Sequence, residues 1–381
     1  MDRKHYDDDH LAFGEAFRAF ADKELAPNYL EWEKDGIAPR EIFSKAGASG
    51  FLGMAIPEEY GGGGVQDFRF NQILAEQVAA AGVTGAGLGL TLHNDTCLPY
   101  FLSYANDEQK QGWLPGIASG ELITAVGMTE PGAGSDLAGI RTSAKRDGDH
   151  YVVNGSKTFI TNGINADLVI TVVRTSEDRH KGLSLLIIER GMEGFERGRN
   201  LDKLGLHSQD TAELSFSDVR VPVANLLGEE GSAFAQLTGK LPQERMSIAV
   251  NGIAEARAAF TETLQYVQDR KAFGTTLSSF QNTKFAMAEM ITEIDVAQAF
   301  VDQCVNRLND GELDAADASK AKWFATEMQG RIIDRCLQLH GGYGYMTEYP
   351  VARRYADARV TRIYGGTTEI MKSVISRSLG F

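Results

Sequence analysis

Cysteine and long apolar runs are scarce in this chain of 381 residues. Its three cysteines, Cys97, Cys304 and Cys336, lie far apart in the sequence. No two of them form the close pair that a disulfide framework or a thiolate zinc site uses, so both are disfavoured and a reducing compartment is indicated. Apolar runs such as Leu185–Ile188 are far shorter than the roughly 20 residues that span a bilayer, so we predict no membrane span.

Basic residues are outnumbered as well. Lys and Arg total 38 against 52 Asp and Glu, which leaves a net charge of −14. A surface of this sign repels phosphate backbones, so nucleic acid is not an expected partner. The start of the chain, with Asp7, Asp8 and Asp9 in a row, is too acidic for a secretory or import leader. We therefore expect a bacterial cytoplasmic protein or the processed form of a protein of the mitochondrial matrix.

Hydrophobic periodicity divides the chain into three predicted domains. Residues 1–120 have helical periods interrupted by breakers such as Pro57 and the run Gly61–Gly64. That glycine run lacks the Lys-Ser/Thr of a phosphate loop, so a surface turn is the better interpretation. Residues 121–228 alternate as strands do, and residues 229–381 return to the helical period. A chain of this length is expected to hold two or three domains.

The middle segment predicts a small all-β domain. Leu168–Val173 and Leu183–Ile188 have the composition of buried strands. Apolar and polar residues alternate around Leu214–Val223 with one break in register, which indicates a strand with one face exposed to solvent. Asn154-Gly155 lies between two strand-like runs and predicts a hairpin turn.

The last segment predicts a helical bundle. Two apolar stripes at helical spacing are separated by Gly311, where we expect a turn between helices. The first comprises Met287, Met290, Ile291, Ile294, Val301, Val305 and Leu308, and the second Phe324, Met328, Ile332, Cys336 and Leu339. The predicted fold class is α+β, mostly α, with an N-terminal helical domain, a middle β-barrel-like domain and a C-terminal four-helix bundle.

Four segments carry residues suited to chemistry. The segment 128–136, read with Phe159–Asn162, combines glycines with hydroxyls that can donate to a polar ring or a phosphate, although Glu-Pro-Gly-Ala-Gly alone also reads as a turn. The segment 338–345 ends a predicted helix in several glycines, which is either a cofactor contact or an ordinary helix stop. His340 has no partner at metal-ligand spacing, so no metal site is predicted.

The other two segments lie on the C-terminal part. In 364–370, Thr367 or Thr368 is a candidate N-cap behind two glycines. The segment 241–246 contains Glu244 beside Arg245, and 270–274 follows later on the same helical hairpin. A Glu beside an Arg on a helix is ordinarily a solvated pair.

In their order, these segments closely resemble those of the acyl-CoA dehydrogenase family over nearly the whole chain. Thr-Glu-Pro-Gly-Ala-Gly-Ser-Asp at 129–136 and Gln-x-x-Gly-Gly-x-Gly at 338–344 are highly specific to that family. The family fold is helical, then β, then a four-helix bundle, the unusual order predicted above. The resemblance implies FAD as cofactor, an acyl-CoA substrate, an electron-transferring flavoprotein as electron acceptor and a homotetramer.

The resemblance also assigns roles to individual residues. Those that match flavin-lining positions are Met128, Thr129, Gly134, Ser135, Phe159 and Thr161. Those that match contacts to the FAD of a neighbouring subunit are Arg270, Phe273 and Gln281. The adenosine-pyrophosphate contacts correspond to Gln338, His340, Gly341 and Gly342, and the last FAD-contacting segment to Thr367 and Glu369. The acyl-CoA contacts correspond to Ser135, Arg245, Gly365 and Gly366.

One departure from the family pattern locates the predicted base. Many members carry the catalytic Glu in Tyr-Glu-Gly-Thr, but this chain has Gly365 there. The long-chain and isovaleryl branches carry it instead just before the helical Arg, where this chain has Glu244. Leu-Pro-Gln-Glu-Arg with Tyr-Gly-Gly-Thr resembles the long-chain branch most.

The resemblance implies that Glu244 takes the α-proton while the β-hydride passes to flavin N5, which yields a trans-2-enoyl-CoA. A carboxylate in such a dry pocket should have a raised pKa. The developing enolate needs a donor, either the backbone N–H of Gly365, which we favour, or that of Glu369, together with a ribityl hydroxyl of FAD. Branched or isoprenoid-type acyl-CoA remains an alternative substrate. A flavin monooxygenase, a nitroalkane oxidase or a non-catalytic flavoprotein is an alternative function.

Overall fold

Helices fill the N-terminal part, in agreement with the helical periods of the sequence. The computed structural model describes residues 3–179 and 181–381. The N-terminal helices are α1 (Asp8–Phe20), α2 (Tyr29–Asp35), α3 (Glu41–Ala48), α4 (Phe68–Ala81), α5 (Thr84–Thr91), α6 (Leu98–Tyr104) and α7 (Asp107–Ser119). Helix α7 begins with a reciprocal capping box between Asn106 and Gln109 and ends at Gly120, whose left-handed φ of 75° stops the helix.

A π-helical turn, Leu92–Cys97, separates α5 from α6. Such turns are rare, and they change the phase at which the following side chains leave the helix. The turn lies against helix α8, as α4 and α6 of the N-terminal domain also do.

The middle part is a curled sheet, in agreement with the predicted β domain, and the described residues give it seven strands. The strands are β1 (Thr124–Gly127), β2 (Ser143–Asp147), β3 (His150–Thr161), β4 (Leu168–Arg174), β5 (Leu183–Glu189), β6 (Phe195–Asn200) and β7 (Thr211–Pro222). Their order is β1-β4-β2-β3-β7-β6, and β5 also pairs with β4. Residues 168–173 and 183–188 are buried along their whole length, which explains why both read as continuous apolar runs.

The hairpin turn predicted at Asn154-Gly155 was wrong. Strand β3 runs straight through these residues, and the hairpin lies earlier, where Asp147 pairs with His150 across Gly148. Opposite Asn154, strand β7 carries an irregularity in which Asp218 has a φ of 52°. The Asn154 side chain accepts from the N–H of Asp218 at 2.9 Å and donates to its carboxylate at 2.9 Å, so it holds a bulge rather than a turn.

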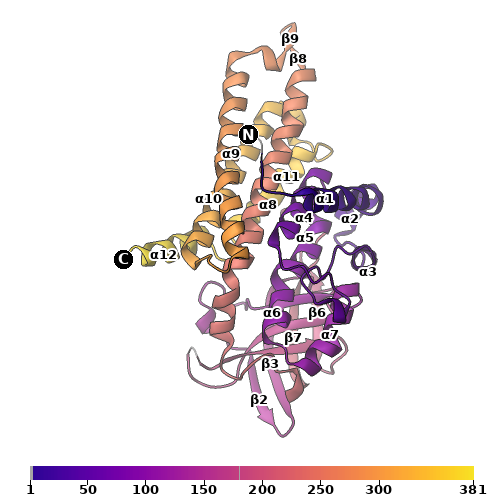
Figure 1. Cartoon of the computed structure of the whole chain (residues 1–381), viewed down its shortest axis with the longest axis vertical. Coiled ribbons are helices and arrows are strands. Elements are labelled where there is room, and N and C mark those ends of the chain that lie inside the picture. Colours follow the sequence, from indigo (N-terminus) through magenta and orange to yellow (C-terminus); the bar gives the residue numbers. More distant parts are fainter. Residues whose placement is uncertain (1–2, 180) are drawn as a thin grey trace.

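The C-terminal part is a helical bundle that extends away from the sheet (Figure 1). Its helices are α8 (Ala233–Asp269), α9 (Gln281–Asn309), α10 (Ala315–His340), α11 (Pro350–Ala358) and α12 (Thr368–Ser378), and the hairpin β8 (Lys271–Ala272) and β9 (Thr275–Thr276) joins α8 to α9 at the far end. Helix α12 projects sideways with the C-terminus. In the described ranges, no helix is both long enough and apolar enough to cross a bilayer.

The predicted apolar stripes form the core of this bundle, with one exception. Met287, Met290 and Ile294 on α9 pack against Met328 and Ile332 on α10 in one buried cluster. Gly311, with a φ of 72°, makes the turn between the two helices.

Phe324, predicted to belong to the second stripe, is 43% exposed. It lies on α10 and is only partly covered within a single chain, so the prediction that it is buried was wrong.

Candidate active site

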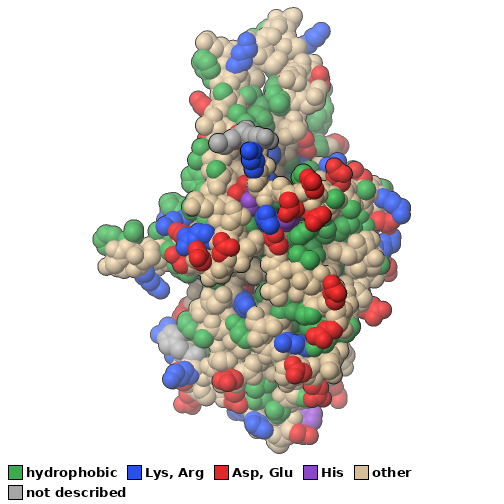
Figure 2. Space-filling view, in the orientation of Figure 1, with side chains coloured by type: hydrophobic (Ala, Val, Ile, Leu, Met, Phe, Trp, Pro, Cys, Tyr) green, Lys and Arg blue, Asp and Glu red, His purple; other side chains and the backbone are tan. Residues whose placement is uncertain are grey.

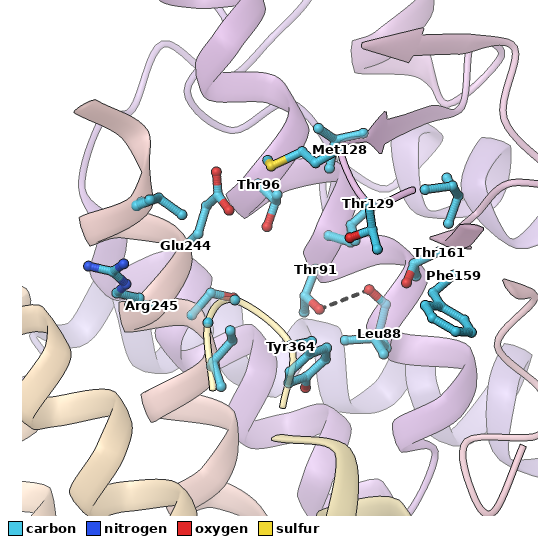
Figure 3. A pocket seen from close by; sticks show the side chains of 18 of the residues that line it. Leu88, Thr91, Thr96, Met128, Thr129, Phe159, Thr161, Glu244, Arg245 and Tyr364 are labelled. Atoms are coloured by element: carbon cyan, nitrogen blue, oxygen red, sulfur yellow. Dashed lines mark hydrogen bonds between the residues drawn. The ribbon is translucent and has the colours of Figure 1, made fainter. Parts of the chain in front are cut away.

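A cavity lies where the three parts of the chain meet. Its wall combines the α5–π-helix region, the ends of β1 and β3, one face of α8 and the turn before α12. Ten residues that the sequence singled out line it: Met128, Thr129, Gly134, Ser135, Phe159, Thr161, Glu244, Arg245, Gly365 and Gly366. Figure 3 shows Glu244 on one side of this cavity, with Thr161 and Phe159 on the opposite side.

Glu244 is buried on α8 and does not form the solvated ion pair that is usual for adjacent helical charges. Burial raises the pKa of its carboxyl to about 7, although a hydrogen bond from Tyr100 and the charge of Arg245 act in the opposite direction. Tyr100 donates to Oε1 at 2.8 Å and is the only hydrogen-bond partner that the described residues give this side chain. The expectation of a raised pKa at this position is therefore confirmed.

Arg245 is also buried, and its guanidinium is only partly satisfied. Nη1 donates to the Ser319 hydroxyl at 3.2 Å, whereas Nε has no partner in the part of the chain that the structure describes. Burial lowers the pKa of the Arg245 guanidinium, and Glu244 offsets part of that effect. A buried cation with an unused donor beside a cavity is suited to an anionic or polar ligand.

Gly365 occupies a position that rejects a side chain. Its φ is 63°, and a Cβ added there would lie 2.3 Å from Cδ1 of Ile248. Ile248 lies one helical turn after Glu244 on α8, so both face the same cavity. The Gly365 backbone N–H has no acceptor among the described residues and is free to bind a ligand oxygen. Lys322 Nζ donates to the Gly366 carbonyl and holds this turn in place.

A buried ion pair supports the segment that begins at Met128. Lys157 Nζ contacts Glu130 Oε1 at 2.8 Å and the Met128 carbonyl at 3.1 Å. The Glu130 carboxylate also accepts from the N–H groups of Arg141 and Thr142, at 2.7 Å and 2.9 Å. The segment is therefore a turn, as its Pro and Gly indicate, but one whose position at the cavity is imposed by a charge on β3.

The sheet side of the cavity offers donors that the protein itself does not use. Within the described part of the chain, no hydrogen bond joins the hydroxyls of Thr129, Ser135 or Thr161 to another residue. Phe159 is 67% exposed and has a φ of 61°, which is strained for an aromatic residue. Free hydroxyls beside an exposed aromatic ring are suited to a flat, polar-edged ligand.

The remaining predicted residues do not join this cavity. Arg270 and His340 line a separate groove at the far end of the bundle, where the Arg270 guanidinium lies 5.1 Å from the centre of the Tyr343 ring. Phe273 is 97% exposed at the β8–β9 hairpin. The cavity lining likewise lacks the exposed residues Gln281, Gln338, Gly341 and Gly342, as well as Thr367, which precedes α12, and Glu369 on α12.

Two of these residues have local roles in the chain. Thr367 is the N-cap of α12 and accepts from the N–H of Ile370, which confirms one of the two predicted caps. His340 is buried, its Nδ1 lies 2.9 Å from the Cys336 carbonyl, and its ring stacks on Tyr266 with centroids 4.1 Å apart.

Several residues at the site were missed from the sequence. Tyr100, Thr96 and Asn251 belong to no motif, and the π-helical turn that places Thr96 has no signature in the sequence. Ile248 could have been found, because it follows Glu244 by four residues on a predicted helix.

Comparison with known proteins finds one family over nearly the whole chain. Family models for the acyl-CoA dehydrogenase N-terminal, middle and C-terminal domains match residues 7–121, 125–219 and 231–380. The mitochondrial long-chain specific acyl-CoA dehydrogenase of Sus scrofa is 46% identical over 99% of this chain and 88% of its own.

Solved structures of acyl-CoA dehydrogenases also match this chain. An acyl-CoA dehydrogenase of Geobacillus kaustophilus is 48% identical, with a TM-score of 0.97 over 99% of this chain and 100% of its own. A glutaryl-CoA dehydrogenase of Mycobacterium smegmatis, solved with FADH2, is 28% identical, with a TM-score of 0.91 over 99% of this chain and 95% of its own.

The fold and the cavity together define an oxidoreductase that works with a flavin. More specifically, the chain belongs to the acyl-CoA dehydrogenase family. Acyl-CoA dehydrogenases are FAD flavoproteins that act in fatty acid oxidation. The residues present fit that cofactor, because the free hydroxyls of Thr129, Ser135 and Thr161 and the exposed ring of Phe159 offer donors and an aromatic surface beside one cavity.

Proposed function

We propose that this enzyme oxidises a long-chain acyl-CoA to the trans-2-enoyl-CoA, with Glu244 as the base that removes the α-proton. One observation carries the proposal. Glu244 is a buried carboxyl with a pKa raised to about 7, and it faces the same cavity as the predicted flavin-lining residues. A base is most effective when its pKa lies near the working pH.

Gly365 supports the same assignment. A carboxylate at position 365 would need both a left-handed backbone and the space that Ile248 fills. The chain thus has no room for a base on the turn and has one on α8, across the cavity from Thr161. Position 365 lacks a Glu and position 244 carries one, so the chain keeps the base that proton abstraction requires.

Three protein groups have distinct tasks in the proposed reaction. Glu244 accepts the α-proton, the Gly365 N–H binds the thioester oxygen where negative charge develops, and Arg245 contacts the acyl-CoA through the donor that no described residue uses. The alternative oxyanion donor, Glu369, is exposed on α12 and does not line the cavity, so we favour Gly365. FAD, when bound, accepts the hydride that leaves Cβ.

The preference for a long acyl chain rests on similarity. The Sus scrofa relative is named as long-chain specific, and the position of the base on α8 agrees with that branch. Branched or isoprenoid-type acyl-CoA is the second candidate, because a base on this helix serves branched substrates as well.

We further propose a homotetramer that passes its electrons to an electron-transferring flavoprotein. Large apolar side chains that a single chain leaves exposed support the assembly. They include Phe285 on α9, Phe324 on α10, and Leu379 and Phe381 just beyond α12. Figure 2 shows hydrophobic side chains at the tip of the projecting α12. Light scattering of the purified protein measures the assembly, and a monomer would refute it. Reoxidation of the reduced enzyme by an added electron-transferring flavoprotein tests the acceptor.

The central experiment is an anaerobic titration of the holoenzyme with straight-chain, branched and isoprenoid acyl-CoAs, followed by flavin absorbance. We expect long straight chains to bleach the flavin fastest. Glu244→Gln should still bind acyl-CoA but bleach at least about 10³-fold more slowly, because the α-proton has no acceptor.

The outcomes separate the alternatives. Bleaching by branched chains alone would replace the long-chain assignment without removing the enzyme class. No bleaching by any acyl-CoA, with rapid reaction of the reduced flavin with oxygen, would favour a monooxygenase. Equal rates in wild type and Glu244→Gln would refute the role of Glu244.

A further inference from the structure

Tyr100 contacts Glu244 from the side away from the cavity. Its side chain is fully buried, and its hydroxyl donates to Glu244 Oε1 at 2.8 Å. Glu244 lines the cavity, whereas Tyr100 is not part of the cavity wall. One carboxylate oxygen is therefore held by the protein, and the other has no hydrogen bond among the described residues. Any effect of Tyr100 on a ligand in the cavity must pass through Glu244.

The local fold explains how Tyr100 comes to this position. It lies in the first turn of α6, directly after the π-helical turn Leu92–Cys97 and Pro99. The π-helical turn contributes Leu92 and Thr96 to the cavity, while the next turn places Tyr100 against the far side of Glu244. One irregular helix thus supplies both a cavity wall and a support for the carboxylate.

Among the described residues, Tyr100 alone donates a hydrogen bond to Glu244, and the other polar groups nearby act through charge or burial. Arg245 is its neighbour on α8, and Lys322 on α10 faces Arg245. The Cys97 thiol, at the end of the π-helical turn, has a pKa raised by burial and stays neutral over the working range. A neutral hydroxyl that donates to a carboxylate favours its charged form, and this opposes the effect of burial.

We propose that Tyr100 is a positioning residue for the proposed catalytic base. Its hydroxyl fixes Oε1 of Glu244, leaves the other oxygen to receive the α-proton, and favours the ionised form of the carboxyl. This inference rests on the proposed role of Glu244 as base.

The test is the pH profile of flavin reduction for wild type and Tyr100→Phe. A hydrogen bond to a charged group is strong enough to hold a pKa down by about one to two pH units. The acid limb of kcat/KM should therefore move up by about that amount, with a loss of about 10- to 100-fold at pH 5.5. Near pH 9, where Glu244 is at least about half ionised in both proteins, the variant should regain about half of the rate or more.

Tyr104→Phe is the matched control. Tyr104 lies on the same helix, and its hydroxyl donates to the Gln236 carbonyl at 3.3 Å rather than to Glu244. The acid limb of kcat/KM for Tyr104→Phe should coincide with that of wild type. An unchanged acid limb in Tyr100→Phe, whether its rate is normal or uniformly reduced, would overturn the proposal and leave Tyr100 as a packing residue.

A direct titration separates this inference from the proposed function. Infrared difference spectroscopy follows the protonated carboxyl of Glu244, identified by the band that Glu244→Gln lacks, and needs no turnover. The midpoint should rise in Tyr100→Phe even if no acyl-CoA is oxidised, and an unchanged midpoint would refute the inference. Should Tyr100→Phe not fold, a fluorinated tyrosine at position 100, with a more acidic hydroxyl, should lower the midpoint instead; no change would again refute it.

Discussion

Glu244 is expected to destabilise the folded protein at neutral and alkaline pH. Its pKa is about 7 in the structure, against 4.5 for an unperturbed Glu. Because the folded state binds the proton more tightly, the cost of this carboxyl is small below pH 4.5. It grows as the pH rises from 4.5 to 7 and is constant above 7.

The size of this effect follows from the two pKa values. A difference of 2.5 pH units, from 4.5 to about 7, corresponds to a plateau of about 3 kcal/mol. At pH 5 the same linkage leaves a cost of only about 1 kcal/mol. Glu244→Gln has nearly the same shape and never ionises, so it should be more stable than wild type by about 3 kcal/mol at pH 8 and about 1 kcal/mol at pH 5.

Denaturant unfolding of both holoenzymes at the two pH values, with FAD held at the same excess, measures this difference. A second variant, Glu213→Gln on an exposed position of β7, controls for the general effect of removing a negative charge. A stability gain that is the same at pH 5 and pH 8, or a loss at pH 8, would show that Glu244 is not a strained, buried acid. The buried carboxyl of Glu244 would then not lower the stability of the folded protein.

Two further predictions concern the supports of the cavity. Gly365→Ala should weaken FAD binding and slow flavin reduction, because it adds about 1–2 kcal/mol of left-handed strain and a clash with Cδ1 of Ile248. Valine lacks that atom, so adding Ile248→Val should restore part of the loss in the double variant. No restoration would contradict the steric argument. Lys157→Met should lower stability by about 3 kcal/mol, because it leaves the Glu130 carboxylate buried without its cation. Thermal unfolding should show that Glu130→Gln partly rescues Lys157→Met, whereas additive losses would mean that the pair does not interact.

Several features of the protein could be predicted from the sequence because they depend on neighbours along the chain. The continuous apolar runs of β4 and β5 identify strands that are buried on both faces, and the stripe from Met287 to Val305 identifies the inner face of α9. Thr367 could be predicted as a cap because capping is a contact within one turn. The residues at the cavity wall were found through motif segments whose glycines and hydroxyls lie a few positions apart.

Other features could not be predicted because they depend on contacts between distant parts of the chain. Asn154-Gly155 is suited to a hairpin turn, yet it lies within strand β3, where the Asn154 side chain hydrogen-bonds Asp218 at the bulge in β7. Phe324 has the spacing of a core residue, but a single chain leaves 43% of it exposed.

The same division holds at the candidate site. The sequence determined the three-part architecture, and it predicted the cofactor segments and the choice of Glu244 over Gly365 as the candidate base. The tertiary structure alone decided that Glu244 is buried, that Ile248 excludes a side chain at Gly365, and that Tyr100 holds the carboxylate across 144 positions of sequence. The physical reason is that burial and hydrogen bonding, which set the pKa of a carboxyl, come from groups that only folding brings together.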